Sequence, residues 1–198
     1  MKPQFGDFLS IWNMPWQRML GVIDWASGGN ACHHCAMVLP PPSWHSLDAD
    51  KPFVFDAWQP RSRYMPWSEY AETMLGWATH WQYRRGRKPF KAKLLRHPSL
   101  NPIQLNRLHA SAQAMLDIRY NMVVNWTYGG AAIHCSEYDA RCSVAADLTR
   151  REDYLDRRGQ WKKLDKATPF ECEAAKLARG FQVVYEYDAE NLSELVGG

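Results

Sequence analysis

The 198-residue chain has no long hydrophobic run and no strong excess of one charge. No segment approaches the ~18–20 consecutive apolar residues of a membrane-spanning helix. Residues 1–16, MKPQFGDFLSIWNMPW, carry Gly, Asp, Asn and Pro where a signal peptide needs an apolar core. The net charge of +3 is too small for a nucleic-acid-binding surface. The basic cluster QYRRGRKPFKAK at 82–93 is read first as a solvated loop entering a strand, and second as a contact for an anionic polymer. We therefore expect no membrane span and no nucleic-acid partner.

The chain also lacks a regular cysteine framework. Five cysteines are an odd number, which argues against paired disulfides and for free thiols in a reducing compartment. CHHC at 32–35 offers four zinc-type ligands in a row, but adjacent residues of a strand point to opposite faces, so at most two could reach one metal. A structural zinc would need a second ligand pair, and no other Cys-x-x-Cys occurs. We expect no metal and no other cofactor.

What is present indicates one soluble domain spanning 1–198. Apolar residues make up 46% and charged residues 23%, and the ten tryptophans and nine tyrosines suggest a surface or groove lined with rings. The apolar runs at 35–39 and 53–58, joined by a turn-rich segment, predict an antiparallel hairpin. Hydrophobic periodicity and capping residues predict strands at 6–12, 35–39, 53–58, 91–96 and 181–188, and helices at 14–27, 67–81, 101–117, about 136–150, and 168–180. The expected fold is α+β, with an antiparallel sheet packed against helices.

The stretch AIHCSEYDARC at 132–142 places a cysteine directly before an expected helix. Ser136 and Asp139 form an S-x-x-D pattern, which predicts an N-terminal cap pair. Cys135 would then lie at the helix N-terminus, where backbone N–H groups and the helix dipole lower the pKa of a thiol and make it nucleophilic. The alternative is that Cys135 is a small buried hydrophobic residue.

A nucleophilic thiol needs a base, and His34 is the best placed. It directly precedes the apolar run 35–39, and Asp56 lies near the end of the partner run 53–58. Antiparallel pairing brings the start of one strand opposite the end of the other, where paired Cβ atoms lie ~5 Å apart. Asp56 could therefore fix the orientation of the imidazole, as the acid of a catalytic triad does. The alternatives are a hydrogen-bonded structural histidine and a strand-end acid facing water.

The order His, acid, Cys resembles the circularly permuted papain-like branch of the NlpC/P60 superfamily, the group with YiiX- and YaeF-like proteins. The matching segments, in order and over nearly the whole chain, are GDFL, HHCAMVL, VFDAW, KAKLLR, IRYNMVVNW, IHCSEY and TPFECEAAKLARGFQVVYEY. The chain departs from the family pattern at three positions: Asp56 stands where Glu is usual, Asn121 where Asp is usual, and His33 where Ser is usual. Asp56 matters most, because a shorter acid must lie closer to the imidazole.

The resemblance implies a papain-like fold and a cysteine hydrolase with a Cys135–His34–Asp56 triad. Cys135 would attack an amide or ester carbonyl while His34 takes its proton. If Asp56 does not reach the imidazole, Asn125 or a backbone carbonyl would orient His34 instead. Tyr120 and Ser136 would contact the substrate or the oxyanion, although Tyr120 fits a core ring equally well.

The leading functional expectation is a cysteine amidase or endopeptidase acting on short peptides, with bacterial cell-wall (peptidoglycan) peptide as the favoured substrate. The alternatives are an acyltransferase or thioesterase acting on lipid-like esters, and a non-catalytic binding module. Without a recognised export signal, the expected location is the cytoplasm of the producing cell. A cell-wall substrate would then require delivery by a non-secretory route as an antibacterial toxin, with an immunity protein as a partner.

Overall fold

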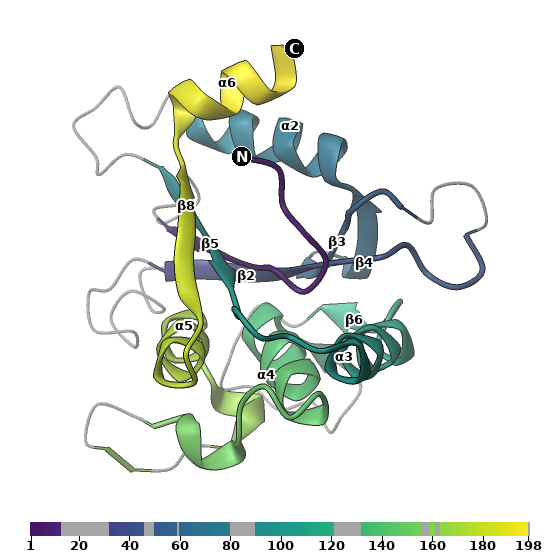
Figure 1. Cartoon of the computed structure of the whole chain (residues 1–198), viewed down its shortest axis with the longest axis vertical. Coiled ribbons are helices and arrows are strands. Elements are labelled where there is room, and N and C mark those ends of the chain that lie inside the picture. The colour runs from purple at the N-terminus through teal and green to yellow at the C-terminus, as the bar shows by residue number, and fades with distance from the viewer. Residues whose placement is uncertain are drawn as a thin grey trace.

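The computed structural model describes residues 1–12, 32–45, 50–58, 60–79, 90–120, 132–155, 159–160 and 163–197. One sheet separates two groups of helices (Figure 1). The strands are β1 (Phe8–Trp12), β2 (Cys32–Leu39), β3 (Phe53–Trp58), β4 (Arg61–Pro66), β5 (Lys91–Arg96), β6 (Arg119–Tyr120), β7 (Ala132–Ile133) and β8 (Gln182–Tyr187). The helices are α2 (Trp67–Ala78), α3 (Pro102–Ala114), α4 (Cys135–Ala145), α5 (Pro169–Ala178) and α6 (Ala189–Gly197), with short 3-10 turns η2 (Arg151–Asp153) and η3 (Leu164–Lys166).

The sheet has eight strands in the order β7-β6-β4-β3-β2-β1-β5-β8. The expected hairpin of β2 and β3 is confirmed, with Met37 opposite Phe55 and Leu39 opposite Phe53. The expected antiparallel sheet forms the centre, and β6 and β7 at one end of the strand order pair in parallel. These two strands are two residues long, too short to leave a periodic pattern in the sequence.

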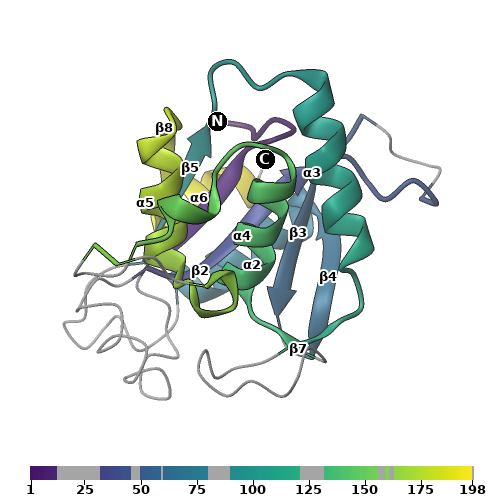
Figure 2. The same ribbon diagram turned by 90° about the horizontal axis from the view of Figure 1, so that it is seen from below.

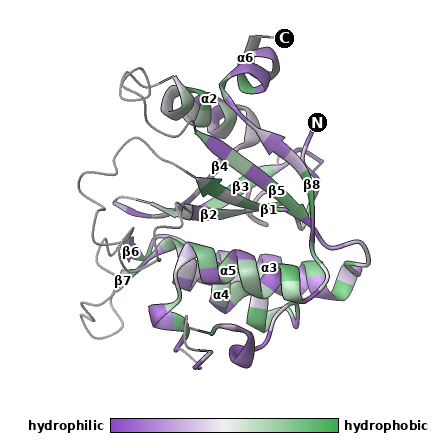
Figure 3. Cartoon of the chain, turned by 90° about the vertical axis from the view of Figure 1, so that its left-hand side faces the viewer, coloured by the Kyte–Doolittle hydropathy of each residue, from purple (hydrophilic) through white to green (hydrophobic). Residues whose placement is uncertain are grey.

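The two faces of the sheet carry separate cores, because side chains alternate along each strand. On β2, Cys35, Met37 and Leu39 pack toward α3 and α4, whereas Ala36 and Val38 pack toward α2 and α6. Figure 3 shows the sheet between these two helical layers. Each fully buried aliphatic or aromatic side chain of these cores contributes roughly 1.5–3 kcal/mol of hydrophobic stabilisation. The result is an α+β fold of three layers.

Helix boundaries follow local chemistry where capping residues are present. Asn101 caps α3 through a reciprocal pair of hydrogen bonds with Gln104, and Thr168 and Glu171 cap α5 in the same way. Gly180, at φ +90°, follows the end of α5, as expected. The helix expected at 136–150 ends earlier, at Ala145, because Asp147 adopts a left-handed conformation at φ +55°.

Other expectations differ in extent or lie outside the described residues. The helix expected at 14–27 and most of the basic cluster at 82–93 lie outside them. Strand β4 and helix α6 were not expected. RSRYMP lacks a clear apolar alternation. Asp188 was taken as the end of the strand at 181–188, whereas it caps α6 through reciprocal hydrogen bonds with Asn191. Within the described residues, no helix is both long and apolar enough to cross a membrane.

Candidate active site

Cys135 is the first residue of α4, and the preceding residue caps that helix. His134 adopts an extended conformation, and its Nδ1 accepts a hydrogen bond from the backbone N–H of Glu137 at 3.2 Å. The predicted cap pair of Ser136 and Asp139 is therefore wrong. The helix begins one residue earlier than expected, which places both side chains inside the helix. Cys135 nevertheless lies at the helix N-terminus, where the dipole favours a thiolate.

His34 and Asp56 lie side by side in the interior, as the hairpin predicts. His34 Nε2 is 3.1 Å from Asp56 Oδ2, and the two side chains are 0% and 1% exposed. Val38 lies opposite Val54 on this pair of strands, and side-chain alternation puts His34 and Asp56 on the same face as these two residues. This arrangement suits an aspartate, because the short side chain still reaches the imidazole.

A fourth residue, Arg63, completes this arrangement. It lies directly opposite Asp56 on β4, and its Nε donates to Asp56 Oδ1 at 3.0 Å. Each carboxylate oxygen of Asp56 therefore has one partner, His34 on one side and Arg63 on the other. Sequence reasoning missed Arg63 because β4 was not predicted, and RSRYMP carries no apolar alternation that would have marked it as a strand.

The imidazole is enclosed by aromatic rings and lies near the thiol. The ring centroids of Trp58 and Trp77 are 4.9 Å and 6.4 Å from that of His34, both in edge-on orientation. Cys135 comes from the opposite face of the sheet. Its charge and a side-chain hydrogen bond with it both raise the pKa of His34, so the thiol lies beside the imidazole.

Electrostatics in this group favour a thiolate and an imidazolium. Burial alone would lower the pKa of His34, but the charge of Cys135 and the hydrogen bond with Asp56 raise it to about 9. A hydrogen bond from Cys35 contributes most to holding the pKa of Cys135 well below its ordinary value; burial opposes this, and the charge of His34 adds to it. Burial would raise the pKa of Asp56, but the hydrogen bond from His34, followed by Arg63, keeps it below its ordinary value.

The remaining thiols behave differently. Burial raises the pKa of Cys35, of Cys142 and of Cys172, so all three remain protonated where Cys135 is ionised. Cys35 lies next to Cys135 and donates a hydrogen bond to it. The sequence indicates this position, because Cys35 directly follows His34 on the expected strand. Successive side chains of a strand point to opposite faces, so Cys35 points to the face that α4 covers.

The two further candidates have different positions. Tyr120 lies on β6, with its ring 6.4 Å from that of Trp58, and burial followed by the nearby Cys135 raises the pKa of its phenol. Ser136 is fully buried, and its hydroxyl donates to the backbone oxygen of Ala167 at 2.6 Å. Tyr120 therefore borders the thiol, whereas Ser136 holds the start of α4 against the segment before α5. Asn121, Asn125 and the side chain of His33 lie outside what the structure describes.

Comparisons with known proteins give a structural neighbour and no relative by sequence. No family model matches the chain, and no curated protein matches it. A solved structure, that of YiiX from Escherichia coli O157:H7, described as a metalloprotein, superposes with a TM-score of 0.62 at 16% identity. The match covers 95% of this chain and 99% of YiiX. At that identity the likeness concerns the fold alone, and it shows that the chain has a YiiX-like fold over nearly its whole length.

Proposed function

We propose that the protein is a cysteine hydrolase in which Cys135 is the nucleophile, His34 the general base and acid, and Asp56 the group that orients His34. The observation that carries this proposal is the buried 3.1 Å contact of His34 with Asp56, beside a cysteine at the N-terminus of a helix. A thiol that merely filled core volume would not need a buried imidazole and carboxylate next to it. Burying such polar groups is costly unless they are paired.

The proposed reaction proceeds through an acyl-enzyme. The thiolate of Cys135 attacks the carbonyl carbon of an amide, and the negative charge passes to the carbonyl oxygen. The backbone N–H of Cys135, at the positive end of α4, stabilises that oxygen. The C–N bond then breaks as His34 gives its proton to the leaving nitrogen. Water, deprotonated by His34, attacks the thioester, and release of the acid regenerates the thiolate.

Asp56 and Arg63 support the imidazole in this scheme. Because Nε2 of His34 contacts Asp56, Nδ1 on the opposite side of the ring is the nitrogen that we assign to the thiol proton. The ion pair with Arg63 keeps Asp56 ionised and limits rotation of its carboxylate. The imidazolium formed during the reaction is therefore stabilised by a fixed negative charge.

The proposed substrate class is a short peptide, and the favoured test substrate is bacterial cell-wall peptide. This substrate rests on the resemblance of the ordered sequence motifs. Acyl transfer from a lipid-like ester would use the same Cys135 and His34. Compared with amide hydrolysis, it differs in the acyl donor and in the group that accepts the acyl chain. The experiment must therefore separate amide hydrolysis from acyl transfer.

The test is incubation of the full chain with purified peptidoglycan and, in parallel, with short-chain acyl thioesters, followed by mass analysis of the products. Release of peptide fragments by the wild type and not by Cys135→Ala supports the proposal. Turnover of acyl esters alone would replace amide hydrolysis with acyl transfer. Absence of products from both substrate classes with the wild type, or equal turnover by Cys135→Ala, would overturn the hydrolase proposal.

A further inference from the structure

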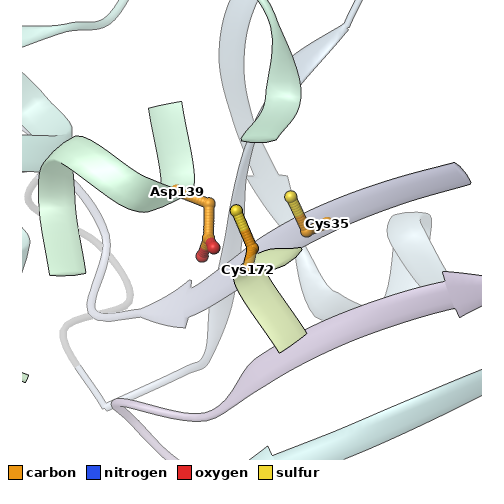
Figure 4. Close-up of side chains that lie close together, drawn as sticks. All are labelled: Cys35, Asp139 and Cys172. Atoms are coloured by element: carbon orange, nitrogen blue, oxygen red, sulfur yellow. The ribbon is translucent and has the colours of Figure 1, made fainter. Parts of the chain in front are cut away.

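A second group of polar side chains lies behind Cys135, inside the protein. Cys35 on β2, Asp139 on α4 and Cys172 on α5 converge from three separate elements (Figure 4). Their two sulfur atoms and a carboxylate oxygen lie within 4.8 Å of one another, and all three residues are buried. The group takes one residue from the CHHC segment and completes it with residues more than a hundred positions away.

Only one of the two carboxylate oxygens of Asp139 has a partner among the described residues. Oδ2 forms a buried ion pair with the ammonium group of Lys176. Oδ1 has no hydrogen-bond partner among the residues that the structure describes. Cys172 Sγ donates to the backbone oxygen of Ser136 at 3.3 Å, and its thiol also lies close enough to the Asp139 carboxylate to lower the pKa of that group. A buried acceptor without a donor is costly, and this one lies beside two sulfur atoms.

We propose that Cys35, Asp139 and Cys172 bind a single divalent metal ion of the zinc type. Two thiolates and one carboxylate carry three negative charges, and a divalent ion together with Lys176 carries three positive charges. The buried group is therefore neutral overall when the ion is bound. Binding releases the two thiol protons to solvent, because the thiolate is the ligand. The hydrogen bonds from Cys172 to Ser136 and from Cys35 to Cys135 are given up at the same time.

The distances suit such an ion after small side-chain rotations. In a tetrahedral zinc site with Zn–S bonds of ~2.3 Å, ligand atoms lie about 3.7 Å apart. The three atoms here are already within 4.8 Å. Thiolate ligands favour zinc over magnesium or calcium. Lys176 does not compete for the ion, because it uses Oδ2 and leaves Oδ1 for the metal. Water supplies the fourth ligand.

The position of the ion gives it a structural role. It ties together the three elements that surround the thiol, because Cys35 follows His34 directly and Asp139 lies one helical turn after Cys135. Burial of all three ligands indicates a closed site. This inference does not depend on the proposed hydrolase chemistry.

The test uses the full chain, reduced and stripped of metal, and titrates it with Zn²⁺ and with Co²⁺ in the absence of any substrate. We expect one ion per chain by elemental analysis, a thiolate-to-cobalt absorption band in the near ultraviolet, and a higher melting temperature with metal. Cys172→Ser should weaken binding at least about 100-fold, since changes outside the ligand shell alone cost 10–100-fold. Asp139→Asn provides a second ligand variant should Cys172→Ser fail to fold.

Two matched controls separate this site from its surroundings. Cys142→Ser alters another buried cysteine of α4 that is not part of the cluster and should bind as the wild type does. Cys135→Ala removes the proposed nucleophile and should also bind normally, so the metal proposal and the hydrolase proposal fail independently. The metal site is ruled out if the wild type gives no cobalt–thiolate band, or if Cys172→Ser and Asp139→Asn both bind as tightly as the wild type. Loss of binding in Cys135→Ala would move the metal to the catalytic thiol and overturn the assignment.

Discussion

His34 Nε2 and Asp56 Oδ2 lie 3.1 Å apart in the interior of the protein, and Arg63 holds the other oxygen of the same carboxylate. The three side chains come from neighbouring strands, so the sheet itself fixes their spacing. Figure 2 shows α4, whose first residue is Cys135, packed against this part of the sheet. The predictions below test what this arrangement does.

Replacing the proposed nucleophile should abolish activity and keep the fold. Cys135→Ala removes one sulfur atom from a small side chain, so we expect a loss of activity to the background rate and little change in stability. Product formation and the urea midpoint measure the two effects. Cys142→Ala, on the same helix, is the control and should retain most activity. Retained activity in Cys135→Ala would refute the nucleophile assignment.

Substitutions of His34 and of Asp56 should lower kcat/KM by different amounts. His34→Ala should lower it nearly as much as Cys135→Ala, because the effects of residues in one catalytic unit are not additive. Asp56→Asn should lower it by a factor roughly 10² smaller than His34→Ala does, since base and nucleophile remain. Steady-state kinetics of the purified variants measure this. A silent His34→Ala together with an inactive His33→Ala would show that the wrong histidine has been assigned.

Arg63 should act only through Asp56. We expect Arg63→Gln to lower kcat with little change in KM, because the arginine orients the carboxylate and leaves the nucleophile untouched. The effect should largely disappear in an Asp56→Asn background, where there is no charged carboxylate to orient. A double-mutant cycle on kcat/KM measures this coupling. Fully additive losses would place the role of Arg63 elsewhere, for example in substrate binding.

Alkylation should single out one cysteine. At neutral pH in the folded protein, iodoacetamide should modify Cys135 before Cys35, Cys142 or Cys172, because the pKa of its thiol is lowered and theirs are raised. Peptide mass analysis over time measures the order. His34→Ala should slow labelling of Cys135, since it removes the neighbouring positive charge. Faster labelling of Cys35 or Cys142 would count against Cys135.

The buried ion pair of Lys176 with Asp139 should matter more for stability than an exposed one. Lys176→Met leaves a buried carboxylate unpaired and should destabilise the metal-free protein by about 3–5 kcal/mol. Lys91→Met breaks an ion pair with Glu186 whose side chains are 51% and 49% exposed, and should cost about 1 kcal/mol or less. Urea denaturation measures both. Equal effects would show that Asp139 finds another partner.

Local sequence determined much of the secondary structure. The capping residues around Asn101 and Thr168 and the alternating runs of β2 and β3 act over a few residues, so their outcome is visible in the sequence. The hairpin also brings His34 to Asp56, because antiparallel register follows from the two apolar runs. The order of His34, Asp56 and Cys135 along the chain also carried the resemblance to YiiX-like proteins, and the YiiX structure superposes on this chain with a TM-score of 0.62.

Tertiary structure decided what depends on contacts between distant segments. Arg63 reaches Asp56 because β4 adds to the sheet beside β3, and the unremarkable sequence of β4 does not predict that pairing. His134 rather than Ser136 caps α4, because Ser136 is drawn to the backbone of Ala167, thirty-one positions away. Cys35, Asp139 and Cys172 meet only when α4 and α5 pack on β2. No local pattern records such proximity, since it arises from packing of whole elements and not from the propensities of neighbouring residues.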